Sequence, residues 1–194
     1  MIVDYKNLYV TADIKRNKLA EVKKTTDKIL EGKARYEAVA AKLGNGIPWW
    51  FIGITHFMEA GLYYPKHFNF HLHCGDPLTG RTFHVPKNRP AANPGGGTKP
   101  PSKENPYSWE ESALDALVFM GYDKQTSWSI SSCLFLFEKY NGMGYNKKGL
   151  LSPYVWSYTN HYTKGKYSDD GKYDPELVSK QAGTAALMKQ LNII

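Results

Sequence analysis

The residues best suited to chemistry are two carboxylates and a threonine. Glu59 closes an apolar run that begins at Trp49; sixteen residues separate it from Asp76, and five separate Asp76 from Thr82. A carboxyl at the C-terminal end of an apolar helix is poorly solvated and meets the negative end of the helix dipole, which raises its pKa. Such a carboxyl suits a general acid, while Asp76 and Thr82 together can hold and activate one water molecule.

Both carboxylates also have a purely structural explanation. A glutamate at a helix end can turn outward to water, and an aspartate followed by proline, as in Gly75-Asp76-Pro77, is a common turn starter. If both carboxyls act on a glycosidic bond, a separation of about 6.5–9.5 Å indicates inversion, and a shorter one makes Asp76 a nucleophile. We expect inversion.

The segments that must position these residues are two helices and a hairpin. Apolar residues recur every seven positions from Val22 to Leu43, which predicts a long helix over residues 12–43. Pro48 suits the first turn of a second helix, apolar on most sides and ending near Gly61. Broken alternation over residues 68–85, with turn residues in the middle, predicts a small hairpin that bears Asp76 and Thr82.

The rest of the chain adds a loop and further helices. Residues 86–106 hold six of the eleven prolines and a triple glycine, which predicts an exposed, mobile loop; a linker between domains is the other interpretation. Capping patterns predict helices from Ser108 to Met120 and from Asp174 to about Leu191, and an apolar stripe predicts a helix from Ser127 to Tyr140. Residues 141–171 are expected to be irregular. The expected fold is a single α+β domain over residues 1–194, mostly helical, with a small β-hairpin lobe beside the active-site cleft.

Composition and charge limit the partners. The chain has 194 residues and a net charge of +7, a balance that suits an anionic partner such as nucleic acid, a membrane surface or a bacterial wall polymer. The N-terminus shows no signal peptide, and the longest apolar run is short for a membrane span. A module that only binds nucleic acid or carbohydrate is a further alternative, but no nucleic-acid-binding signature is visible and no nucleic-acid partner is expected. We therefore expect a protein that is not inserted in a membrane.

The arrangement of Glu59, Asp76 and Thr82 resembles that of phage lysozymes, the endolysins. There a glutamate ends a helix and acts as the acid, and an Asp-x5-Thr hairpin positions the water. The connection from Glu59 to Asp76 is longer here than in that family. The resemblance implies a muramidase that cleaves the β-1,4 bond between N-acetylmuramic acid and N-acetylglucosamine, needs no cofactor, and acts as a monomer on bacterial peptidoglycan. It would reach the wall by phage-mediated release or by another export route.

A second resemblance concerns the segments FEKYNGMGY, residues 137–145, and SPYVWSYTNHY, residues 152–162. They are similar to segments of goose-type lysozymes and lytic transglycosylases, a superfamily whose catalytic glutamate also ends a helix. The transglycosylases work without a second carboxylate, so a transglycosylase acting through Glu59 alone is an alternative. The resemblance implies that Tyr140 and Asn141 line the sugar site. Tyr154 and Tyr158 are also expected to contact the substrate, because aromatic rings with a polar tip stack on sugars, and so are His73 and Arg81.

A zinc-dependent wall amidase or peptidase is the remaining alternative. Histidine, thiolate and carboxylate are zinc ligands, and the same region carries them in His56, His71, His73 and Cys74. However, no HExxH motif, paired CxxC or other tight ligand spacing is present. The muramidase remains the main hypothesis, with no metal expected.

Overall fold

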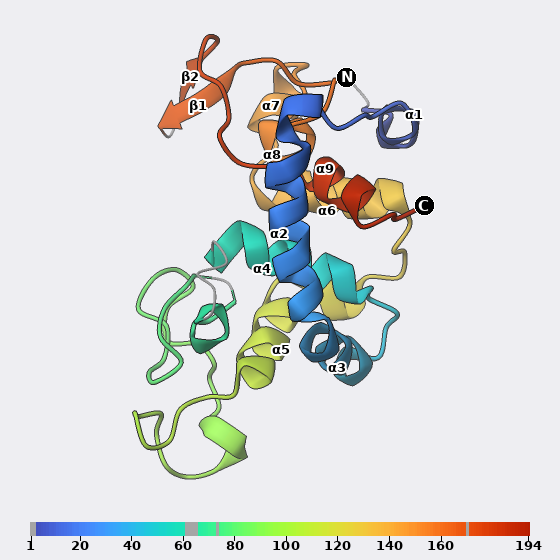
Figure 1. Cartoon of the computed structure of the whole chain (residues 1–194). Helices are drawn as coiled ribbons and strands as arrows, with labels where there is room; N and C mark the ends of the chain where they lie inside the picture. Colours follow the sequence, from blue (N-terminus) through green and yellow to red (C-terminus); the bar gives the residue numbers. More distant parts are fainter. Residues whose placement is uncertain (1–2, 61–65, 73, 170) are drawn as a thin grey trace. The chain divides into compact units, whose positions relative to one another are not determined.

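The computed structural model describes residues 3–60, 66–72, 74–169 and 171–194 (Figure 1). The chain divides into two compact units. The terminal unit combines Met1–Asp27 with Ser129–Ile194, and the central unit is Lys28–Trp128. The expected single domain over residues 1–194 stays a prediction, whereas the mostly helical α+β class is confirmed within the described residues.

The central unit is helical apart from its loops. Helix α2 continues into it from the terminal unit, and α3, α4 and α5 lie wholly inside it. The bounds are α2 Leu19–Glu31, α3 Lys33–Leu43, α4 Trp49–Ala60 and α5 Trp109–Phe119, with 3₁₀ turns η2 His67–Asn69, η3 Pro94–Gly96 and η4 Tyr122–Lys124.

Gly32 divides the helix predicted over residues 12–43 into α2 and α3, so that prediction is wrong. A Cβ atom on Gly32 would lie 2.7 Å from the ring of Phe68 and 2.7 Å from the ring of Tyr36, an approach that only glycine allows. The seven-residue repeat nevertheless continues across the break, because Ile29 and Tyr36 are both fully buried. The apolar pattern alone therefore could not reveal the division.

Helix α4 confirms the buried helix predicted from Pro48, although its expected end at Gly61 lies outside the described residues. Phe51, Ile52 and Ile54 are fully buried in the core. A Cβ atom on Gly53 would lie 2.7 Å from Ile29, so the helix packs closely against its neighbours. Burial of this kind fixes the direction of the helix and therefore the position of its last turn.

Helix α5 begins with the capping box that the sequence predicts. The Glu111 backbone N–H donates to Ser108 Oγ at 3.2 Å, and the Ser108 N–H donates to Glu111 Oε2 at 2.9 Å. The helix ends where Gly121 adopts a left-handed conformation with φ of 77°. Trp109, in its first turn, is buried.

The terminal unit holds short helices and the two-stranded sheet. Helices α1 and α6 pack together, as do α8 and α9. Helix α6 confirms the helix predicted to reach Tyr140, with Ser129 as its N-cap. The bounds are α1 Tyr5–Val10, η1 Arg16–Lys18, α6 Ile130–Tyr140, α7 Gly144–Lys147, α8 Pro153–Trp156, β1 Lys166–Asp169, β2 Lys172–Asp174 and α9 Thr184–Gln190.

The last helix begins ten residues later than predicted. Asp174 Oδ1 accepts the N–H groups of the two residues that follow Pro175, as a cap would, but α9 starts only at Thr184. Between them the chain bonds to an earlier segment: the Gly183 N–H donates to the Ser157 carbonyl at 3.0 Å. Tertiary hydrogen bonds therefore replace the helical ones that the local signal favoured.

The small antiparallel sheet is not where the sequence predicted a hairpin. Strands β1 and β2 pair in the terminal unit, in a stretch expected to be irregular (Figure 1). Within the described part of residues 68–85, the expected hairpin reduces to one bridge between Phe70 and Pro77. This segment is closed by side-chain hydrogen bonds instead of a strand ladder.

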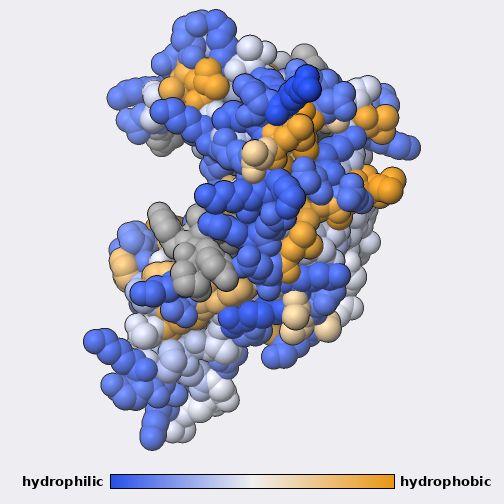
Figure 2. Space-filling view, viewed as in Figure 1, coloured by the Kyte–Doolittle hydropathy of each residue, from blue (hydrophilic) through white to orange (hydrophobic). Residues whose placement is uncertain are grey.

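Residues 86–106 form an exposed loop whose inner part is anchored. Hydrophilic and near-neutral residues cover its tip in Figure 2. Pro90 and Pro94 are buried, and the Tyr107 hydroxyl donates to the Ala92 carbonyl at 2.7 Å. The predicted exposure is confirmed, and the predicted mobility stays a prediction. Across the described chain, no helix has the length and apolar character needed to cross a membrane.

Candidate active site

Glu59 occupies the last turn of α4 and is partly exposed. The charge of Glu59 acts on the thiol of Cys74, whose pKa is raised to about 12 by burial first and by neighbouring carboxylates in addition. Glu59 therefore lies within electrostatic range of the segment that begins at Cys74. Residues 74–93 of that segment are named the Asp76 loop below.

Asp76 is the centre of this loop. Its side chain is 2% exposed and accepts four hydrogen bonds. Oδ2 accepts the backbone N–H of Phe83 at 2.9 Å, the backbone N–H of His84 at 3.0 Å and the Cys74 thiol at 3.2 Å. Oδ1 lies 2.6 Å from Nδ1 of the His84 ring. The carboxylate thus joins the two ends of residues 74–84.

These donors decide the charge of Asp76. Burial alone raises the pKa of a carboxyl, but the backbone and ring of His84, the backbone of Phe83 and the Cys74 thiol together outweigh it. The net result lowers the pKa of Asp76 to about 2, so this side chain is a carboxylate at neutral pH. Because all its bonds are to the protein, the carboxylate holds the loop and presents little surface to water.

Thr82 and Arg81 close the second half of the loop. Thr82 is buried; its hydroxyl donates to the Pro86 carbonyl and accepts the Arg89 N–H at 2.9 Å. The Arg81 guanidinium donates to carbonyl groups of the loop and, at 2.7 Å, to Asn93 Oδ1. The expected roles of Thr82 on a water and of Arg81 on substrate stay predictions, and both side chains already bond within the loop.

An ion pair fixes the loop to α5. Arg89 donates from Nε and Nη2 to both carboxylate oxygens of Asp115, at 2.9 and 2.6 Å. Both side chains are largely shielded from solvent, and the two-point geometry restrains the guanidinium. The Asp76 loop is therefore held at one side by Asp76 and at the other by the helix.

The histidines of the zinc alternative are used in packing. The ring nitrogens of His71 lie 2.6 Å from Ser112 Oγ and 2.8 Å from the Gly80 carbonyl. His56 is fully buried, and burial lowers its pKa to about 3. His73 lies outside the described residues. Among the residues that are described, no group of three or more His, Cys, Asp or Glu side chains is arranged to hold a metal ion.

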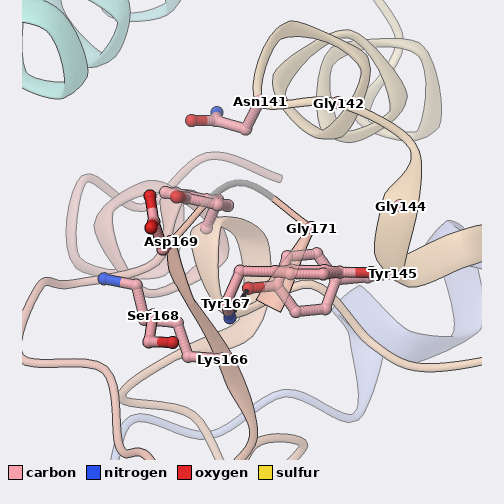
Figure 3. Close-up of a pocket in the computed structure, with 10 residues that line it drawn as sticks. Asn141, Gly142, Gly144, Tyr145, Lys166, Tyr167, Ser168, Asp169 and Gly171 are labelled. Carbon is pink, nitrogen blue, oxygen red and sulfur yellow. Dashed lines mark hydrogen bonds between the residues drawn. The ribbon is translucent and has the colours of Figure 1, made fainter. Parts of the chain in front are cut away.

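A second candidate region is a pocket in the terminal unit, named the tyrosine pocket (Figure 3). Figure 3 shows Asn141, from the end of α6, on the opposite side of the pocket from the residues of β1. The cavity measures about 590 Å³. It is lined by Asn141, Gly142, Gly144, Tyr145, Tyr154, Lys166, Tyr167, Ser168, Asp169 and Gly171.

The tyrosine pocket combines flat rings with cations. The rings of Tyr145 and Tyr167 are 5.0 Å apart and nearly perpendicular, so they form a right-angled wall. Lys166 Nζ lies 5.8 Å from the centre of the Tyr154 ring, and Lys148 Nζ lies 5.2 Å from that of Tyr167. Aromatic faces with polar edges suit the apolar faces and hydroxyls of a sugar, and the lysines suit a carboxylate.

The expected substrate contacts divide between the two units. Asn141 and Tyr154 share the tyrosine pocket, whereas Tyr158 is buried and its hydroxyl donates to Glu21 and to the Lys180 carbonyl. Tyr140 is half-buried at the end of α6. Glu59, Asp76, Thr82 and Arg81 all belong to the central unit.

His84 and Arg89 are the residues that the sequence analysis missed. Each partners a carboxylate of the central unit, namely Asp76 and Asp115. The spacing of eight positions between Asp76 and His84 was available in the sequence, but it becomes a signal only once the loop is known to turn back on Asp76.

Comparison with protein-family models, with curated proteins and with solved structures found no match to this chain.

Proposed function

We propose that this protein is a peptidoglycan muramidase that hydrolyses the β-1,4 bond between N-acetylmuramic acid and N-acetylglucosamine. Glu59 protonates the glycosidic oxygen as that bond breaks, and a water molecule adds to the sugar carbon. The observation that carries the proposal is the contrast between two carboxyls of one unit. Glu59 is partly exposed at the end of a buried helix and acts electrostatically on Cys74, whose thiol donates to the buried carboxylate of Asp76.

In this proposal Asp76 and Thr82 position the attacking water through the loop that they hold. A carboxylate that is 2% exposed and accepts four hydrogen bonds has little capacity left for a water of its own. The rigidity of the loop then sets where a water can bind. No cofactor takes part, and the protein acts as a monomer.

The tyrosine pocket supports a glycan as the substrate class. The half-buried rings of Tyr154 and Tyr167 offer stacking surfaces, and Lys166 offers a charge partner for the carboxylates of the wall polymer. The net charge of +7 would concentrate the protein on an anionic wall, which is where we propose that it acts. Release by a phage or export by another route would bring it there.

A lytic transglycosylase is the second candidate. The observation that favours it is that hydrogen-bond donors of the protein already occupy the oxygens of Asp76. A transglycosylase needs only one carboxyl and no attacking water, so it would not depend on Asp76. Glu59 would then donate its proton to the leaving oxygen and later take a proton from the sugar's own hydroxyl. The product would be an anhydro sugar instead of a reducing end.

Digestion of purified peptidoglycan with analysis of the products by mass tests the proposal. Muropeptides with reducing ends are expected, and Glu59→Gln should abolish their release because no other acid replaces it. Glu37→Gln is the matched control, since Glu37 is an exposed residue of α3 that pairs only loosely with Lys33. Anhydro products would replace the muramidase with the transglycosylase, and free stem peptides would refute both.

A further inference from the structure

His84 is an exposed imidazole held by a buried carboxylate. Its side chain is 66% exposed, and its Nδ1 lies 2.6 Å from Oδ1 of Asp76, which is 2% exposed. The neighbouring Phe83 ring lies 4.5 Å from it, centre to centre, and limits its rotation. An exposed histidine normally samples several rotamers, so this one is held in place by its partners.

The partner determines which ring nitrogen carries the proton. Asp76 is a carboxylate at neutral pH and can only accept hydrogen bonds, so Nδ1 of His84 must be the donor. In the neutral ring Nε2 then has a free lone pair. Nδ1 faces the protein, and Nε2 is the nitrogen available to bind and deprotonate a water molecule.

The His84 ring is not required to close the loop. Asp76 Oδ2 already receives the backbone N–H groups of Phe83 and His84 and the Cys74 thiol, which join the ends of residues 74–84. Among the residues that the structure describes, the ring is the only hydrogen-bond donor to Oδ1. A carboxylate that is shielded from water while orienting an exposed imidazole is an arrangement typical of a base and its positioning group.

We propose that His84 is the general base of the reaction and that Asp76 is its positioning residue. This inference rests on the proposed function. His84 Nε2 takes a proton from water while the water oxygen bonds to the anomeric carbon of the sugar. The bond from that carbon to the glycosidic oxygen breaks, its electron pair stays on the oxygen, and Glu59 supplies the proton. The proton on His84 then returns through solvent to Glu59, so one water is consumed.

Three substitutions separate this role from a structural one. His84→Asn places an amide N–H near the position of Nδ1, so the bond to Asp76 can persist while the base is lost. His84→Ala removes both. Val85→Ala is the matched control, because it truncates the other neighbour of His84 in the same loop, a side chain that is 81% exposed. Each variant is compared with the wild type in release of reducing ends from purified peptidoglycan and in urea unfolding.

Loss of about 10²–10⁴-fold in rate is expected for both His84 variants, with His84→Asn as stable as the wild type and Val85→Ala within a few-fold in rate. Added imidazole should restore part of the activity of His84→Ala, which a purely structural role would not allow. Activity of His84→Asn within a few-fold of the wild type, while Glu59→Gln is inactive, would overturn the base and leave the muramidase standing. Anhydro products from the wild type would overturn the base as well, because no water attacks in that reaction.

Discussion

Two buried carboxyls, one in each unit, have opposite environments. Asp76 in the central unit and Glu138 in the terminal unit are 2% and 1% exposed. Asp76 accepts four hydrogen bonds, whereas Glu138 Oε2 accepts one, from the Tyr5 hydroxyl at 2.7 Å, and Oε1 has no hydrogen-bond partner among the described residues. The pKa of Asp76 is lowered to about 2, and burial raises that of Glu138 despite the bond from Tyr5. The two carboxyls have nearly the same solvent exposure, so what distinguishes the directions of their pKa shifts is the number of donors that reach each one.

The two shifts have opposite consequences for stability. A carboxyl whose pKa falls on folding stabilises the protein above its ordinary pKa, and this contribution is lost as pH drops through the folded value. For Asp76 that window runs from its ordinary 3.8 down to about 2. A carboxyl whose pKa rises on folding favours the folded state below its ordinary pKa, and this is lost as pH increases. Glu138 belongs to that second class.

The largest effect is expected for Asp76→Asn. The amide keeps the shape of the carboxyl and its oxygen can take the place of Oδ2, which accepts both backbone N–H groups, but the bonds to it and to the His84 ring no longer involve a charge. Hydrogen bonds to charged groups contribute about 1.5–3 kcal/mol and neutral ones about 0.5–1.5 kcal/mol, so over these bonds we expect the free energy of unfolding to fall by about 3 kcal/mol. Urea unfolding at pH 7 measures this.

The control for Asp76→Asn is Asp27→Asn, which removes an exposed ion pair with Lys23 on α2. It should change the free energy of unfolding by less than about 1 kcal/mol. If Asp76→Asn unfolded at the same urea concentration as Asp27→Asn, the donors around Asp76 would not stabilise the loop, and the contrast with Glu138 would be lost.

A smaller effect is expected in acid. The ionisation of Asp76 should contribute on the order of 2 kcal/mol at neutral pH, and this amount disappears between about pH 4 and pH 2. Wild-type stability should therefore fall more steeply than that of Asp76→Asn over this range. Unfolding free energies measured at several pH values give the two slopes, and equal slopes would mean that Asp76 is not a low-pKa carboxylate in the folded state.

Local signals in the sequence predicted the parts of the fold that depend on neighbours in the chain. The capping box at Ser108 and the stop at Gly121 are satisfied within a few residues, so their residue types sufficed. The close packing at Gly32 involves Phe68, which approaches from a distant segment, as well as the nearby ring of Tyr36, and the sequence around Gly32 does not reveal the contact with Phe68. The late start of α9 has the same cause, because residue 183 bonds to Ser157.

The residues of the candidate site also differ in whether local sequence signals could locate them. Glu59 could be located from the sequence because an apolar helix and its last turn are local features. Asp76 was identified, but its partners were not, since the loop closes through side-chain bonds that carry no periodic pattern. That error placed a hairpin over residues 68–85 and overlooked His84. Asn141 and Tyr154, two of the residues expected to contact the substrate, line one pocket, while Lys166 and Tyr167 come from a strand that the sequence analysis did not foresee; the substrate contacts stay predictions.

The smallest effect is expected for Glu138→Gln, which tests the second carboxyl in the comparison of Asp76 with Glu138. The amide oxygen can still accept from the Tyr5 hydroxyl, and the substitution removes only the possibility of a buried negative charge. We expect the free energy of unfolding of the variant to match that of the wild type below about pH 4 and to exceed it by about 1 kcal/mol at pH 8. At pH 8 the buried carboxyl of the wild type must either carry a charge or keep a proton that the unfolded chain has released, and the amide does neither. Urea unfolding at both pH values measures this. Glu176→Gln, at an exposed site beside Lys164, should show no such gain. If Glu138→Gln were less stable than the wild type at pH 8, the terminal unit would supply Glu138 with donors as the central unit supplies Asp76, and burial and hydrogen bonding could not be separated by this pair.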